Sequence, residues 1–117
     1  MKWEYKETHA FDSRLNESTK IREKYPERIP VIVERNPRSD LPNIDKKKFL
    51  VPSDLSVSQL QFIIRRRISL PAEKAMFFFV GKGVLMTNSA NVGSIYSEYK
   101  DEDGFLYVCY SGESTFG

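Results

Sequence analysis

Apolar residues recur along the chain with two different periods, and these periods predict where strands and helices lie. Residues 28–35 form a dense β-branched run, which favours a strand. Residues 46–52 have the pattern of a second strand, and the polar stretch 36–43 between the two contains prolines, which indicates a connecting turn. The sequence therefore predicts an antiparallel hairpin.

A helical period follows this hairpin. Ser56 and Gln59 have the spacing of a capping box, in which each side chain caps a backbone N–H of the other residue. Phe62 and Ile63 are expected to widen the buried face of the helix, and a run of arginines suits its C-terminal end. The positions spaced for one buried face are Val57, Leu60, Ile64 and Ile68.

Shorter segments complete the pattern. We expect a short helix over residues 3–9 and a second one that runs toward Tyr25, with Asp12 as its N-cap and with Phe11 and Leu15 as a hydrophobic staple. Pro26 ends that helix, because the residue before a proline avoids the helical region. The remaining predicted elements are strands over 75–80 and 105–110 and a helix over 92–99.

The order of these elements predicts an α+β fold. Two strands, a helix and two more strands around one sheet make a ubiquitin-like β-grasp roll, here a four-stranded mixed sheet with a ββαββ core and two additional N-terminal helices. A chain of 117 residues suits one domain. We expect a single domain over 1–117, with a helical extension over 1–26, a core over 27–110 and a flexible C-terminal tail over 111–117.

The second predicted strand has an unusual distribution of side chains. Along residues 45–52, Lys48 and Leu50 would share one face, while Phe49 and Val51 would share the other. Apolar side chains on both faces and a run of lysines at the start suit an edge strand that accepts a peptide as an extra strand, with a pocket on either side. The alternative is a solvated lysine run that leads into a core strand.

Composition and charge exclude several classes of protein. Hydrophobic residues make up 40% of the chain, which favours a folded protein, and no apolar run approaches the ~20 residues that a membrane span needs. The N-terminus lacks the apolar core of a signal peptide, and the single cysteine fits a reducing compartment. A net charge of +2 does not indicate a nucleic-acid partner, although residues 1–52 carry 12 Lys/Arg against 9 Asp/Glu.

The sequence offers no set of residues for catalysis. It has no paired carboxylates, no metal-ligand spacing and no arrangement of a Ser or Cys nucleophile with His and an acid, so we expect no enzyme, catalytic residue, metal or cofactor. Cys109 alternates with apolar residues and is expected to be buried, and His9 is expected to lie on the surface.

Long segments of the chain resemble one family. The chain resembles the autophagy ubiquitin-like modifiers, and the GABARAP branch most closely, over essentially its whole length. It departs from that branch in the 81–91 segment, which is one residue longer, and at Leu60 and Gly104, which replace bulkier residues. The segments that carry the resemblance are KIREKYPERIPVIVE (20–34), DKKKFLVPSDL (45–55), FFFV (77–80) and YSGESTFG (110–117).

The resemblance implies a modifier that is joined through Gly117 to phosphatidylethanolamine on the forming autophagosome. The implied partners are autophagy receptors and adaptors, activating and conjugating enzymes, and a cysteine protease that releases the modifier from the lipid. The protein would be cytoplasmic and monomeric before lipidation, and bound to the autophagosome membrane afterwards. Family precursors usually continue beyond this glycine, so a chain ending at Gly117 would be either made mature or truncated.

The resemblance also implies a groove for aromatic-x-x-aliphatic peptides beside the second strand. Its aromatic pocket would be formed by Glu17, Ile21, Pro30, Ile32, Lys48, Leu50 and Phe105. Its aliphatic pocket would be formed by Phe49, Val51, Pro52, Leu55, Leu60 and Ile63. A cationic rim that attracts acidic residues of the peptide would be formed by Arg28, Lys46, Lys47 and Arg67.

Some interpretations remain open at this level. Ile21, Ile32, Ile63 and Phe105 could be plain core residues. Phe77 and Phe79 would share one strand face and Phe78 the other, either as core or beside a second partner surface. Trp3 and Tyr5 would either contact membranes or pack onto the sheet. The main functional alternative is a ubiquitin-like peptide-binding module that is never conjugated.

Overall fold

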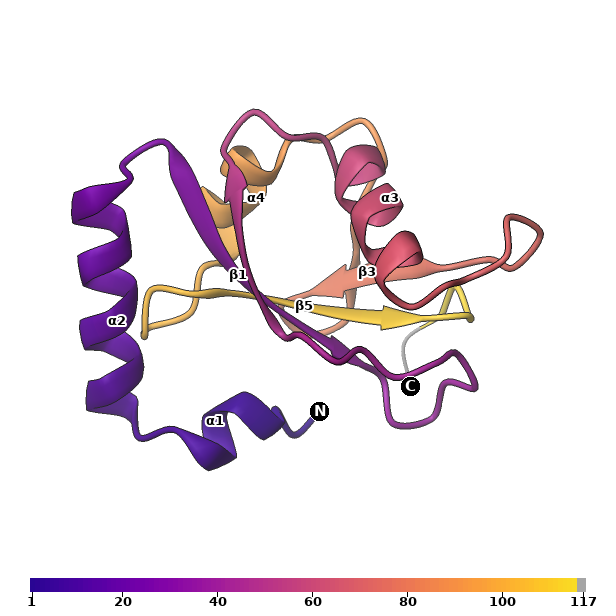
Figure 1. The fold of residues 1–117 in the computed structure, drawn as a ribbon, viewed down its shortest axis with the longest axis horizontal. Coiled ribbons are helices and arrows are strands. Elements are labelled where there is room, and N and C mark those ends of the chain that lie inside the picture. Colours follow the sequence, from indigo (N-terminus) through magenta and orange to yellow (C-terminus); the bar gives the residue numbers. More distant parts are fainter. Residues whose placement is uncertain (116–117) are drawn as a thin grey trace.

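The protein folds as a five-stranded sheet with two helices on one face and the N-terminal helices on the other. A computed structural model describes residues 1–115. The elements are α1 (Glu4–Thr8), α2 (Phe11–Lys24), β1 (Arg28–Arg35), β2 (Lys48–Pro52), α3 (Val57–Arg67), β3 (Phe77–Val80), β4 (Val84–Leu85), α4 (Val92–Tyr99) and β5 (Leu106–Ser111). Figure 1 shows α3 and α4 above the strands, α1 below them and α2 at one end.

The strands are ordered β2-β1-β5-β3-β4, and only the central pair β1–β5 is parallel. This confirms the predicted hairpin of β1 and β2 and the mixed, ubiquitin-like β-grasp sheet. The number of strands differs, because residues 84–85 form a fifth strand where we expected only a loop. Gly81 and Gly83 have positive φ angles of 58° and 83°, which let the chain reverse tightly enough for these two residues to pair with β3.

The main core lies between the sheet and the pair α3 and α4. Val57, Leu60 and Ile64 are 0% exposed and Ile68 is 6% exposed, so the predicted helix face is confirmed. The capping box is also confirmed, since Gln59 N donates to Ser56 Oγ (3.0 Å) and Ser56 N donates to Gln59 Oε1 (2.9 Å). The expectation that Phe62 and Ile63 widen this buried face was wrong: their side chains are 62% and 37% exposed, because the sheet covers only one side of α3.

A smaller core lies under α1 on the other face of the sheet. Tyr5 packs edge-on against Phe105, with 5.6 Å between ring centroids, and Trp3 packs on Tyr107 at 5.1 Å. Of the two alternatives for Trp3 and Tyr5, the structure shows packing onto the sheet. Ile32 belongs to the same cluster and is fully buried.

Several predicted boundaries need correction. Strand β2 starts at Lys48 rather than at 46, β3 at Phe77 rather than at 75, and β5 at Leu106 rather than at 105. Helix α2 starts at Phe11, with Ala10 rather than Asp12 at the N-cap, so Phe11 lies inside the helix and cannot form the predicted staple from outside it. Asp12 instead places its carboxylate in the first turn, where it suits the helix dipole. At the other end of the chain β5 includes Ser111, the first residue of the predicted tail.

Candidate peptide-binding groove

Strand β2 is an edge of the sheet, as the sequence predicted. Val33 N donates to Lys47 O (2.8 Å) and Ser53 N donates to Glu27 O (2.9 Å), so the odd-numbered residues of this segment turn their main-chain groups toward β1. The alternation of an antiparallel ladder then leaves the N–H and C=O groups of Lys48 and Leu50 pointing away from the sheet. The strand therefore presents main-chain groups to which another strand can pair.

The side chains of β2 divide between the two faces as predicted. The register places Phe49 opposite Val31 and Val51 opposite Ile29, all within the main core. The intervening residues face α2, where Leu50 is opposite Pro30 and Lys48 is opposite Ile32. Pro30 is tolerated because β1 starts to pair with β5 only at Val31, so the missing N–H removes no bond from that ladder.

A groove of about 490 Å³ lies between the start of β2 and the outer face of α3. Phe49 and Ile63 line it, as expected for the aliphatic pocket, and they are joined by two residues that the sequence reasoning did not assign there, Phe62 and Arg66. The full lining is Lys46, Phe49, Phe62, Ile63, Arg66 and Arg67. The groove thus combines three apolar side chains with three basic ones.

The other residues expected in the aliphatic pocket lie beside or beneath this groove. Leu60 is 0% exposed and belongs to the core under it, and Val51 is also buried. Leu55 is half-buried against the same core, and Pro52 is exposed at the end of β2. Leu60 and Val51 can therefore support a pocket from below but do not present their side chains to solvent.

On the other face of β2, an ion pair joins the strand to α2. Lys48 Nζ contacts Glu17 Oε2, and the Tyr5 hydroxyl donates to Glu17 Oε1 (2.8 Å). Burial opposes ionisation of Glu17, but the bonds from Lys48 and Tyr5 outweigh it, and the pKa of this carboxyl lies below its ordinary value. The ion pair lies over the place where an aromatic pocket is expected.

The remaining residues of that expected pocket differ in accessibility. Ile21 and Leu50 are half-buried, whereas Pro30, Ile32 and Phe105 are buried, the last two at 0% exposure. Ile32 and Phe105 belong to the small core with Tyr5. They would form the floor of a pocket only after the Lys48–Glu17 ion pair above them separates.

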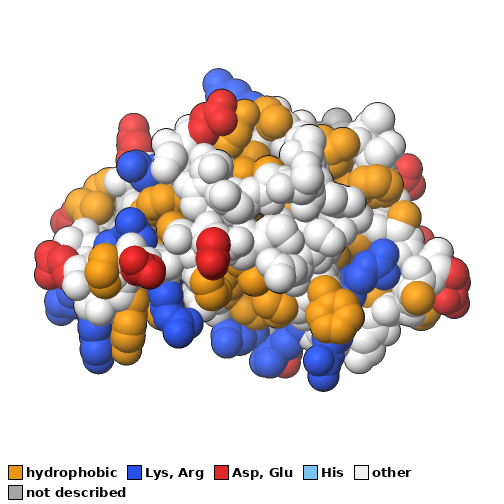
Figure 2. Space-filling view, turned by 90° about the horizontal axis from the view of Figure 1, so that it is seen from above, with side chains coloured by type: hydrophobic (Ala, Val, Ile, Leu, Met, Phe, Trp, Pro, Cys, Tyr) orange, Lys and Arg blue, Asp and Glu red, His pale blue; other side chains and the backbone are white. Residues whose placement is uncertain are grey.

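The four rim cations are placed around β2 with different partners. Lys47 lies between Glu4 (3.7 Å) and Glu34 (3.8 Å), and Arg67 contacts Asp45. The Lys46 ammonium lies 5.0 Å from the centre of the Phe49 ring. Arg28 is exposed, and its carbonyl accepts a hydrogen bond from Arg22 (2.6 Å). Figure 2 shows basic side chains interspersed with apolar ones along the lower border of the molecule.

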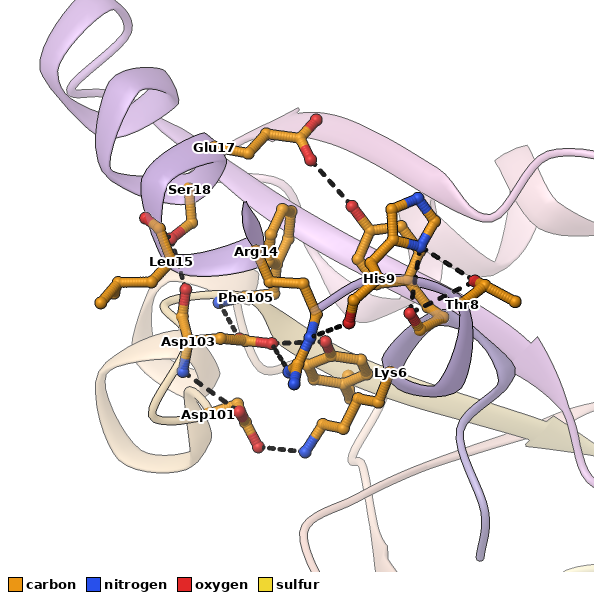
Figure 3. Close-up of polar contacts among 12 residues, drawn as sticks. Lys6, Thr8, His9, Arg14, Leu15, Glu17, Ser18, Asp101, Asp103 and Phe105 are labelled. Carbon is orange, nitrogen blue, oxygen red and sulfur yellow. Dashed lines mark hydrogen bonds and ion pairs between the residues drawn. The ribbon is translucent and has the colours of Figure 1, made fainter. Parts of the chain in front are cut away.

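A buried polar network fixes α2, and with it Glu17, against the sheet. Asp103 Oδ2 accepts from Arg14 Nη1 (2.6 Å) and from the Tyr107 hydroxyl (2.5 Å), while Asp103 Oδ1 accepts from Phe105 N (2.9 Å). Ser18 Oγ donates to the Asp103 carbonyl. Figure 3 shows these groups converging between α2 and the loop before β5. Sequence reasoning missed this network, whose members lie up to 89 residues apart.

Other candidate residues take structural positions. Cys109 is 1% exposed, and burial raises the pKa of its thiol to about 12. Phe78 lies in the main core, and Phe79 is opposite Cys109 on the other face, as the alternation predicted. Within residues 1–115 no group of His, Cys, Asp and Glu is arranged to hold a metal ion, and no helix is long and apolar enough to cross a membrane. Gly117 lies outside the described residues.

Comparison with known proteins identifies the family. Residues 13–117 match the family described as "Autophagy protein Atg8 ubiquitin like". The chain is 60% identical to autophagy-related protein 8c of Arabidopsis thaliana, over 97% of this chain and 94% of the relative. It is 56% identical to autophagy-related protein 8 of Mycosarcoma maydis, over 100% and 98%.

The fold gives the same result. The crystal structure of Trypanosoma brucei ATG8 superposes on the whole chain with a TM-score of 0.91 at 47% sequence identity, and all of that chain is covered. The match includes the ubiquitin-like sheet, the edge strand β2 and the N-terminal helices. The chain therefore belongs to the Atg8 family of ubiquitin-like autophagy proteins.

Proposed function

We propose that this protein is a modifier rather than an enzyme, and that it is conjugated through Gly117 to phosphatidylethanolamine. The Gly117 carboxylate would be activated as an adenylate with release of pyrophosphate. A cysteine of the activating enzyme would then displace AMP to form a thioester, and a cysteine of the conjugating enzyme would take over the acyl group. The lipid amine would finally displace that thiol to form an amide. Membership of the Atg8 family supports this proposal, and glycine suits it because no Cβ crowds attack at its carbonyl.

We further propose that the edge of β2 binds aromatic-x-x-aliphatic peptides of autophagy receptors and adaptors. The observation that carries this proposal is the position of β2, an edge strand with side chains directed to α2 on one face and to the 490 Å³ groove on the other. The peptide would pair with the outward main-chain groups of Lys48 and Leu50. Its aliphatic residue would enter the groove at Phe49 and Ile63, and its aromatic residue would lie over Leu50.

The wider setting follows from the same proposal. The protein would be cytoplasmic and monomeric until lipidated, would then lie on the autophagosome membrane, and would be released by a deconjugating cysteine protease. Within the family the protein would lie closest to the GABARAP branch, which the 20–34 and 45–55 segments resemble.

A reconstituted conjugation reaction tests the first proposal. The chain would be mixed with activating and conjugating enzymes, ATP and phosphatidylethanolamine liposomes, and its intact mass recorded. We expect a gain of one lipid minus one water for the native chain and no gain for Gly117→Ala. No gain with enzymes that conjugate a known Atg8 protein would instead favour the alternative, an unconjugated peptide-binding module.

Calorimetry with a synthetic aromatic-x-x-aliphatic peptide tests the second proposal independently. We expect one peptide to bind per chain, and alanine in place of the peptide's aromatic residue should abolish that binding. A peptide that binds equally well without its aromatic and aliphatic residues would contradict the groove assignment, whatever the outcome of conjugation.

A further inference from the structure

One cation at the edge of the groove already holds a carboxylate of the same chain. Arg67 Nε donates to Asp45 Oδ1 (2.8 Å) and Arg67 Nη2 donates to Asp45 Oδ2 (3.3 Å), a bidentate arrangement. The bonds from Arg67 hold the pKa of the Asp45 carboxyl below its ordinary value, so Asp45 is anionic at neutral pH. The pair joins the last residue of α3 to the segment that enters β2, across one end of the groove.

Arg67 differs from the two arginines beside it. The Arg65 guanidinium donates to the carbonyls of Pro71 and Lys74, and the Arg66 guanidinium lies 5.8 Å from the centre of the Phe62 ring. Of these three arginines, only Arg67 forms an ion pair with a carboxylate within residues 1–115. Arg67 also lines the groove, so its guanidinium is placed to bind a carboxylate of a docked peptide. In the free protein the same guanidinium holds the Asp45 carboxylate.

The pair is accessible enough to be exchanged. The Asp45 side chain is 72% exposed and the Arg67 side chain 43% exposed, so water and a ligand reach both groups. Exposed ion pairs are weak, and an incoming carboxylate with the same geometry would replace Asp45 at a small net cost. A neutral peptide offers no such replacement and leaves the pair intact.

From this geometry we propose that Asp45 is an internal competitor for Arg67, displaced when a peptide carboxylate docks beside the aliphatic pocket. Asp45 would thereby set how strongly the groove favours acidic over neutral peptides. This inference rests on the proposed peptide-binding function of the same groove. According to this inference, Asp45 lowers the affinity of the groove for acidic peptides, although Asp45 lies among basic residues.

Two peptides that differ by a single charge test the proposal. Both carry the aromatic-x-x-aliphatic motif, and one has Glu and the other Gln at the single residue that follows the aliphatic position. Affinities would be measured by calorimetry for the native chain and for Asp45→Asn. We expect Asp45→Asn to bind the Glu peptide roughly two- to fivefold more tightly than the native chain does, the range that exposed ion pairs give. The affinity for the Gln peptide should not change.

Two further variants separate competition from a general change in charge. Asp54→Asn removes one negative charge from an exposed residue just beyond β2 whose carboxylate is not the one that Arg67 holds. It therefore reports the long-range effect of charge alone, which should be smaller than the effect of Asp45→Asn. In an Arg67→Gln background, Asp45→Asn should give no selective gain for the Glu peptide.

The affinities of these variants separate competition for Arg67 from loss of the groove itself. Equal gains from Asp45→Asn and Asp54→Asn, or a gain that survives Arg67→Gln, would overturn the competition while leaving the groove in place. A gain of equal size for the Glu and Gln peptides would do the same. Failure of the native chain to bind either peptide would overturn the groove itself, and the inference with it. Thermal unfolding of each variant shows whether the fold is retained.

Discussion

Lys48 of the edge strand and Glu17 of α2 form an ion pair over the expected aromatic pocket. Tyr5 of α1 donates a hydrogen bond to the same carboxylate, so one glutamate connects both N-terminal helices to β2. A peptide ring that enters between α2 and β2 must part these groups. Glu17 therefore links the stability of the N-terminal helices to the accessibility of the groove.

The stabilisation by Glu17 should depend on pH. Its folded-state pKa lies below the unfolded-state value of about 4.3, so its contribution is fully present above that value and is lost as pH falls through the folded-state pKa. Both side chains are partly exposed, and we expect Glu17→Gln to lower the free energy of unfolding by less than about 1 kcal/mol at pH 7. Urea unfolding from pH 7 to pH 3 should show the two proteins converging. A difference that grows on acidification would contradict this assignment.

Two ion pairs of equal length should contribute very differently. Arg14–Asp103 and Lys6–Asp101 both have N–O distances of 2.6 Å, but the Arg14 and Asp103 side chains are 10% and 0% exposed, against 33% and 25% for Lys6 and Asp101. Arg14→Met leaves the buried Asp103 carboxylate without its cation, and we expect a loss of about 3 kcal/mol. The matched variant Lys6→Met should cost about 1 kcal/mol or less. Chemical denaturation of both variants measures the contrast, and similar losses would contradict it.

Peptide binding should depend on Leu50 more selectively than on Phe49. Phe49 is 7% exposed in the main core, and its replacement by alanine would cost about 3–5 kcal/mol of folding free energy. Leu50 is half-buried on the other face, and covering such a side chain contributes about 1.5–3 kcal/mol, roughly tenfold or more in affinity. Leu50→Ala should therefore weaken binding of an aromatic-x-x-aliphatic peptide about tenfold in calorimetry.

Val84→Ala is the control for that measurement. Val84 lies on β4, the opposite edge of the sheet, and is 42% exposed. It should leave the affinity for the peptide unchanged. If Leu50→Ala and Val84→Ala had the same effect, the peptide would not be bound at β2.

Local signals in the sequence were sufficient to predict most of the helices and strands. The Ser56–Gln59 capping box and the apolar stripe of α3 depend on residues three or four apart, and both are present in the structure. Strand β4 gave no such signal, since it has two residues and both are exposed. It forms only because Gly81 and Gly83 reverse the chain beside β3.

The site was harder to predict than the fold, because its residues meet through long-range packing. Phe62 is apolar and beside the buried stripe of α3, so periodicity places it in the core, and only the position of the sheet shows that it faces the groove. The pairs Lys48–Glu17 and Arg14–Asp103 join residues 31 and 89 positions apart. No local pattern relates such residues, and the alternation along β2 could predict only which face Lys48 takes.

Gly104 should tolerate substitution by alanine much less well than Gly112 does. Gly104 has a φ of +87°, and a Cβ there would lie 2.3 Å from Ser18 Oγ, whereas a Cβ at Gly112 would make an ordinary contact with Leu41 at 3.5 Å. Gly104→Ala combines backbone strain with a clash against α2, and we expect it to cost at least about 1–3 kcal/mol. Gly112→Ala should change stability by under about 1 kcal/mol. Urea unfolding of the two variants checks the difference, and equal effects would contradict the tight approach of Gly104 to Ser18.

Cys109 should be unreactive in the folded protein. Its thiol is 1% exposed and burial raises its pKa to about 12, so at pH 7.5 both the thiolate fraction and access are low. We expect a disulfide reagent to modify the native chain more than about 100-fold more slowly than the chain in guanidinium, because a pKa of about 12 against an unfolded value of about 8.5 alone lowers the thiolate fraction by more than that.

An exposed thiol in the same fold provides the comparison for that rate. Ser89→Cys combined with Cys109→Ser places the thiol in the exposed loop before α4, and this variant should react rapidly without denaturant. The raised pKa also predicts a loss of stability at high pH, since the unfolded chain releases the thiol proton above about pH 8.5 while the folded chain retains it to about 12. Cys109→Ser should remove this part of the alkaline destabilisation. Rapid modification of native Cys109, at a rate near that of the exposed thiol, would show instead that the sheet opens readily around β5.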